Sequence, residues 1–150
     1  MQTLLHSSDL AQLYETDPTL WLEKTIEHLK SDRLDQLDIE HLIEELEDLG
    51  KRDKNKAASL LEQIIRHLLL LQYWSAERDN NASHWEAEID GFRTQLRRHL
   101  TTTLRQYLEQ ELSIIYQDAL RYISKKTRLQ NLPKNCPYSL ENLLDCNWLP

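Results

Sequence analysis

The amino-acid sequence predicts an all-α fold, a single compact helical bundle of about five or six helices. Only two of the 150 residues are glycine and four are proline, which leaves little of the turn chemistry that a protein with many tight turns needs. Leucine, glutamate, glutamine, lysine and arginine are abundant, and all five are good helix formers. Apolar residues recur at spacings of three and four, the period of a helix with one buried face.

Two helices are expected before the first polar connector. One covers about Ser8–Glu15. The second follows Asp17, a favoured N-cap residue, and has Pro18 at its first position, where a missing N–H costs nothing. It runs to about Lys30. Its apolar positions, expected to face the core, are Leu22, Ile26 and Leu29.

The middle of the chain predicts two helices separated by a break. After a connector that ends in a cap at Asp35 or Asp38, a helix is expected to run to Leu49 and to stop at Gly50. Glycine readily adopts the left-handed conformation that ends a helix. A longer helix, about Arg52–Trp74, follows, and its wide apolar arc predicts that it is the most buried helix.

A loop over 75–82 is expected to precede the next helix. Ser83 and Glu86 have the spacing of a capping box, in which two side chains satisfy the free N–H groups of a helix start. The helix that follows carries a core seam that includes Trp85 and reaches Leu100.

Three consecutive threonines, Thr101–Thr103, are expected to end that helix, because threonine is a poor interior residue and a good cap. The last long helix then runs to about Arg128. A proline-containing, irregular tail begins at about residue 129, with one helical turn from Ser139. Residues 1–150 are expected to form one domain.

Composition also bounds location and partners. No stretch approaches the roughly 20 apolar residues that span a bilayer, and the N-terminus lacks the segments of a signal peptide. We therefore expect a cytoplasmic protein that contacts no membrane. Cys136 and Cys146 are expected to be free thiols, since disulfides are rare in a reducing compartment.

The net charge of −7 is unevenly distributed. Residues 1–50 contain thirteen acidic and three basic side chains, whereas residues 51–150 contain twelve acidic and fifteen basic ones. The favoured interpretation is that two oppositely charged surfaces of one bundle attract each other. The functional alternative is an acidic face that receives a basic partner.

The segment 38–50 combines six carboxylates with one histidine. His41, Glu44, Glu45 and Asp48 fall on one side of a helix, opposite an apolar arc of roughly 120°. We favour a solvated acidic face, with a cation site as the alternative if other helices cover it. The apolar arc, expected to face the core, consists of Ile39, Leu42, Ile43, Leu46 and Leu49.

His67 is the other candidate for chemistry. It lies at the edge of its helix's apolar arc, in line with Trp74 two turns on. A histidine there most often donates one N–H to a carbonyl or carboxylate. The sharper hypothesis pairs His67 with Glu44 or Glu45 of a preceding antiparallel helix, as a proton relay or half of a metal site.

Several segments resemble a bacterial, largely cyanobacterial family, domain-of-unknown-function family 29. They are "LDIEHLIEELEDLGK", "RHLLLLQYW", "SHWEAEIDGFR", "YQDAL" and "LPKNCPYSLENLL". The resemblance covers nearly the whole chain and implies a compact helical domain, but it carries no established activity. It departs from the family pattern at Leu70, Leu71, Phe92 and the Thr101–Leu104 break. The positions to which it gives weight are Glu44, Glu45, Glu47, Gly50, His67, Trp85, Ile89, Arg93 and Tyr116.

We expect a non-enzymatic binding or adaptor module that needs no cofactor. Its partner is expected to be another protein, with a second copy of the chain as one candidate. The alternative is a metal-binding, hydrolytic bundle that holds a divalent ion with His67, Glu44, Glu45 and His41. A third hypothesis, weak nucleic-acid contact, uses Arg93, Arg97 and Arg98 and is disfavoured because the domain is acidic.

Overall fold

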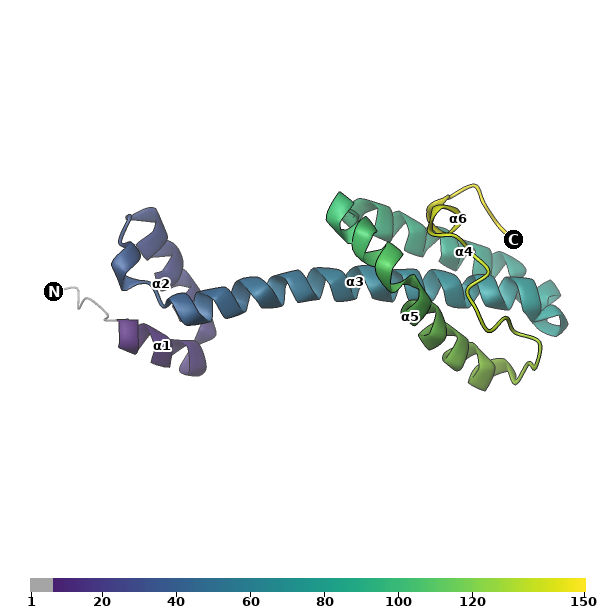
Figure 1. Ribbon diagram of the computed structural model, residues 1–150, viewed down its shortest axis with the longest axis horizontal. Helices are drawn as coiled ribbons and strands as arrows, with labels where there is room; N and C mark the ends of the chain where they lie inside the picture. The colour runs from purple at the N-terminus through teal and green to yellow at the C-terminus, as the bar shows by residue number, and fades with distance from the viewer. Residues whose placement is uncertain (1–6) are drawn as a thin grey trace. The chain divides into compact units, whose positions relative to one another are not determined.

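The computed structural model describes residues 7–150 and confirms the all-α fold class, with no strand in that range (Figure 1). The chain folds as two compact units, the first ending at Lys51 and the second spanning Arg52–Pro150. That residues 1–150 form one domain stays a prediction. In chain order the elements are α1 (Ser7–Thr16), α2 (Pro18–Lys30), the 3-10 turn η1 (Leu34–Gln36), α3 (Ile39–Tyr73), α4 (Ser75–His99), α5 (Thr102–Thr127) and α6 (Leu140–Leu144).

Three predicted helix starts that rest on local capping, those of α2, α5 and α6, are confirmed. The Asp17 carboxylate accepts a hydrogen bond from the backbone N–H of Leu20 at 3.1 Å, and α2 begins at Pro18. The Thr101 hydroxyl does the same at the start of α5, and the Ser139 hydroxyl at the start of α6. Each side chain satisfies a backbone donor that the helix cannot satisfy itself.

The predicted break at Gly50 is wrong, because α3 continues through it as a single helix of 35 residues. Gly50 does not adopt a positive φ. A glycine in a helix costs about 1 kcal/mol relative to alanine. A break at Gly50 would cost more, because the backbone groups on both sides of it would lose their helical hydrogen bonds and a second helix would have to be nucleated. Uninterrupted propagation is therefore favoured.

The predicted loop over 75–82 is also wrong, since α4 begins at Ser75 and the proposed capping box at Ser83 lies inside it. The Arg78 guanidinium donates to the carbonyl oxygens of Leu71 and Gln72, at 2.7 and 2.9 Å. These carbonyls belong to the last turn of α3, where helical partners are missing. One side chain of α4 thus supplies the missing hydrogen bonds at the end of α3. The two helices can therefore follow each other without a loop of several residues.

The core of the second unit is built on the latter part of α3, as predicted for its apolar arc. Nine residues of α3 are buried, more than in any other helix of the described chain. Trp85 and Ile89 of α4 and Leu108 of α5 belong to the same core. The buried α3 residues are Ala57, Leu60, Leu61, Ile64, Ile65, Leu68, Leu69, Leu70 and Leu71.

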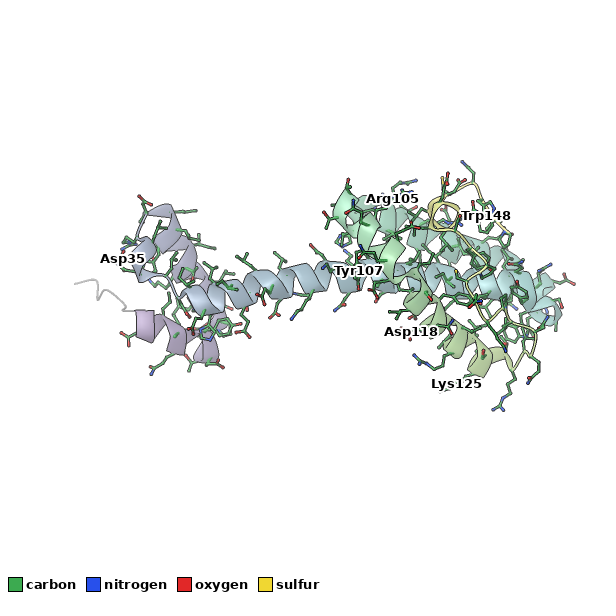
Figure 2. All side chains as sticks on the ribbon, viewed as in Figure 1. Asp35, Arg105, Tyr107, Asp118, Lys125 and Trp148 are labelled. Carbon is green, nitrogen blue, oxygen red and sulfur yellow. The ribbon has the colours of Figure 1, made fainter. Side chains whose placement is uncertain are left out.

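The C-terminal tail is held to this core by side chains that donate to its carbonyls. Arg93 of α4 is buried and donates to the carbonyl oxygens of Leu143 and Trp148, both at 2.8 Å, and of Asn142 at 3.1 Å. Figure 2 labels Trp148 near α6. Three hydrogen bonds from one charged guanidinium therefore fix the end of α6 and the residues after it.

In the first unit the buried face of α2 differs from the prediction. Leu22, Ile26 and Leu29 are between 42 and 51% exposed. The buried residues of α2 are Trp21, Thr25 and His28. Trp21 is the largest of them, and its indole N–H donates to the Asp38 carboxylate at 3.1 Å. The buried face is therefore shifted by one residue from the predicted one. Burying Trp21 is favoured because it removes the most apolar surface from water and gives the indole N–H a partner.

Candidate functional site

The polar side of the first part of α3 is covered by α1 through one aromatic residue. The ring of Tyr14 stacks on the imidazole of His41, with centroids 4.1 Å apart and planes at 17°. Its hydroxyl donates to Glu45 Oε1 at 2.8 Å. This hydrogen bond, together with burial and nearby carboxylates, raises the pKa of Tyr14 to about 12. The predicted solvated acidic face is therefore corrected: His41, Glu45 and Asp48 are half-buried, and Glu44 is exposed.

His41 is held on its other side by a buried carboxylate. Asp38 Oδ2 lies 2.6 Å from His41 Nδ1 and accepts the indole N–H of Trp21. The hydrogen bond that Asp38 accepts from the ring raises the pKa of His41, because it favours the charged imidazolium. The carboxylate of Glu15 lies 4.0 Å from His41 Nε2. These contacts favour a proton on His41, and they pack α1 and α2 against the start of α3.

A metal role for these residues stays a prediction, and the geometry bears on it at two points. An imidazolium has no free lone pair, so raising the pKa of His41 opposes metal ligation. Among residues 7–150, no three or more His, Cys, Asp or Glu side chains are grouped as a metal ion would need.

His67 is not brought to the acidic residues by antiparallel helices, because His67, Glu44 and Glu45 all lie on the single helix α3. Its Nδ1 lies 2.7 Å from the carbonyl oxygen of Gln63 and therefore carries the proton. Burial lowers the pKa of His67, which favours the neutral ring. The ring lies 5.5 Å from that of Phe92. This is the core-edge histidine that the simpler interpretation predicts.

The apolar side of the same part of α3 is the feature that the prediction placed wrongly. Ile39, Ile43, Leu46 and Leu49, expected in the core, are between 50 and 60% exposed, and we call these four residues the α3 stripe. The reason is that Tyr14 packs on the polar side, about 100° around the helix from the arc. The fold thus buries polar groups with partners and leaves large aliphatic side chains in water.

The remaining candidate residues have structural contacts or open surroundings. Trp74 and Trp85 stack with centroids 6.0 Å apart. Tyr116 donates its hydroxyl to the carbonyl oxygen of Pro133 in the tail, and burial raises its pKa to about 12. Glu47 is exposed on α3, and Gly50 has no heavy atom within 4 Å of the position that a Cβ would take.

The basic residues of the third hypothesis are divided. Arg93 is buried and uses its guanidinium on the tail, whereas Arg97 and Arg98 are exposed on the next turn of α4. Arg93 therefore cannot contact a phosphate without releasing three carbonyl groups.

Tyr14, Trp21 and Asp38 are members of the His41 network that the sequence reasoning missed. A signal for Asp38 was available, because Asp-x-x-His at a helix start places a cap and the third helical residue on one side. The Asp38 carboxylate indeed also accepts the backbone N–H of His41, at 3.4 Å. No local pattern identified Tyr14, which arrives from another helix.

Comparison with known proteins returns a family model described as "Domain of unknown function DUF29", which matches residues 13–149. The match includes most of the first unit and nearly all of the second. No curated protein and no solved structure matches the chain. Within residues 7–150, no helix has both the length and the apolar character that crossing a membrane requires.

Proposed function

Because the chain belongs to the DUF29 family, whose description names no activity, we propose its function from its own surface: a non-enzymatic module that binds another protein. The α3 stripe carries this proposal. Four large aliphatic side chains at spacings of four, three and three residues are half exposed on one helix face. Grouped exposed apolar residues mark interaction sites on soluble proteins, whereas single ones do not.

The energy available at the stripe is adequate for binding. Fully burying an aliphatic side chain of this size is worth about 1.5–3 kcal/mol, and each of the four has about half of that still to gain. Together they could contribute roughly 3–6 kcal/mol before the entropy cost of association. A partner that also meets polar groups at the border can bind stably.

The polar side of α3 supports the same function, because its His41 and Glu45 side chains make contacts within the first unit. Glu45 accepts a hydrogen bond from Tyr14, and His41 is held by Asp38. These contacts fix α1 against α3 and so present the stripe on a supported helix. We also propose that the protein acts in the bacterial cytoplasm, which agrees with its two free cysteines.

The test is affinity purification of the full chain from its host cells, followed by quantitative mass spectrometry. We expect a partner protein that is recovered with the wild type and lost with Ile43→Gln/Leu46→Gln. The matched control is Ile114→Gln, which changes a side chain of α5 that is 60% exposed, the same as Leu46. Recovery of the same proteins with all three chains would contradict the proposal.

A further inference from the structure

We infer that the occupant of the α3 stripe is an amphipathic helix whose apolar face is bordered by lysine or arginine side chains. This inference rests on the binding function proposed above and specifies the chemistry of the partner. Two properties of the first unit carry it, the spacing of the stripe and the acidic charge beside it. In addition, neither unit of a second copy offers a surface that fits both the stripe and its charge.

The spacing of the stripe fits a helix. Ile39, Leu46 and Leu49, with half-buried Leu42, occupy the first and fourth positions of two consecutive heptads, and Ile43 widens the seam. Side chains at this period insert between those of a second helix with the same period. An extended strand would instead need an exposed sheet edge, and none exists among residues 7–150.

The border of the stripe is acidic. Glu40, Glu44 and Glu47 are exposed and fall beside Ile43 on the helical wheel, within about 40–100° of it. Glu40 and Glu47 form no ion pair within the described residues. The opposite border is occupied by the contact of α1 with His41 and Glu45. A helix on the stripe therefore meets three carboxylates along its accessible side.

The first unit of a second copy does not match this border. It would supply an apolar stripe, but it carries the same excess of acids, thirteen against three bases in residues 1–50. Placing two such faces together sets like charges against each other, which disfavours association.

The second unit of another copy fails for the opposite reason. It is slightly basic, yet its large exposed apolar residues are only Ile114, Tyr122 and Leu149. An anionic membrane surface fails on charge, because carboxylates beside the stripe are repelled by it. A separate helix with an apolar face and basic borders satisfies both requirements.

The test uses designed peptides and the full chain, with binding followed by fluorescence anisotropy. The first peptide has leucine at the first and fourth heptad positions and lysine or arginine at the flanking positions. The second has the same leucines with glutamate flanks, and the third has the first peptide's composition in scrambled order. We expect the first peptide to bind at least about tenfold more tightly than the others, with affinity that falls as salt rises.

Two sets of variants locate the site. Ile43→Gln/Leu46→Gln should weaken the first peptide at least about tenfold, and Glu40→Gln/Glu47→Gln should weaken it about threefold to tenfold and reduce the salt dependence. The controls are Ile114→Gln for the first pair and Glu109→Gln, an exposed carboxylate of α5, for the second. Both controls should leave affinity unchanged.

Different failures have different meanings. Equal binding of the glutamate-flanked peptide would overturn the inferred charge, and binding by none of the peptides would overturn the helical partner. Both would leave the binding function intact if partner recovery from cells still depends on Ile43 and Leu46. A dimer in analytical ultracentrifugation that Ile43→Gln/Leu46→Gln dissociates would assign the stripe to a second copy instead. Loss of both peptide binding and stripe-dependent recovery would remove the function itself.

Discussion

Tyr14 of α1 lies flat on His41 of α3, with ring centroids 4.1 Å apart. This contact decides which side of the helix faces inward. Tyr14 also donates to Glu45, so a single residue covers two polar side chains that would otherwise stand in water. Because α1 takes the polar side, the apolar side stays exposed as the α3 stripe. The proposed binding face is thus a consequence of a polar contact.

The two histidines of α3 should give stability profiles of opposite sign. The hydrogen bond that Asp38 accepts from the ring, with the carboxylates of Glu44 and Glu15 nearby, raises the pKa of His41 in the folded state. Its stabilising effect is therefore complete below the unfolded pKa of about 6.5 and is lost as pH rises through the raised value. We expect the first unit to weaken from about pH 6 to 8.

For His67 the sign is reversed. Burial lowers its pKa, against weaker opposite effects from Gln63 and Glu88. The neutral ring is favoured in the folded state, so stability is full above a pH of about 6.5 and falls as pH falls toward the lowered pKa. The measurement is urea unfolding between about pH 5 and 8. His41→Gln should remove the loss at high pH and His67→Gln the loss at low pH. Unchanged pH profiles in both variants would refute these assignments.

Three helix starts were predictable from the sequence because a single side chain caps each of them. Asp17, Thr101 and Ser139 each cap a helix through a hydrogen bond to a backbone N–H three residues on. Such contacts depend only on local geometry, so residue type and position are sufficient. The family resemblance implied the same fold class as the composition, and the matching family model confirms the family.

The errors concern features that distant residues decide. Residues 75–82 have a loop-like composition, yet Arg78 reaches the end of α3 and makes a helix favourable there. The apolar arcs of α2 and α3 are real in the sequence, but which side is buried depends on where Trp21 and Tyr14 pack. A single sequence without tertiary contacts gives the arcs and not their partners.

Replacing Arg93 by methionine should release the tail. Arg93 is 4% exposed and makes three hydrogen bonds to carbonyl groups near the end of the chain. Methionine fills a similar volume but leaves those carbonyls without donors, so we expect a loss of about 2–4 kcal/mol in unfolding free energy. Limited proteolysis should also cut the variant after residue 139. Arg97→Met, at an exposed position of the same helix, should change neither result.

Replacing Arg128 by glycine should increase the unfolding free energy. It caps α5 with a φ of 59°, in the left-handed region where a Cβ is strained. Arg128→Gly removes that strain, and we expect a gain of about 1 kcal/mol, measured by urea unfolding of the second unit. Glu109→Gly, at an exposed interior position of the same helix, should cost about 1 kcal/mol. Destabilisation by both substitutions would show that Arg128 contributes more as a side chain than its backbone costs.

Gly50 provides the sharpest test of the continuous α3 helix. If the helix passes through it, as the structure shows, alanine has open space and lowers the entropy of the unfolded chain. Gly50→Ala should then raise helix content and increase unfolding free energy by about 0.5–1 kcal/mol. If Gly50 instead ended a helix with positive φ, alanine would be strained and stability would fall by a similar amount. Gly91→Ala, which also has no heavy atom within 4 Å and lies inside α4, is the matched control and should be stabilising in either case. Circular dichroism with urea titration of the two variants therefore distinguishes one long helix from two shorter ones.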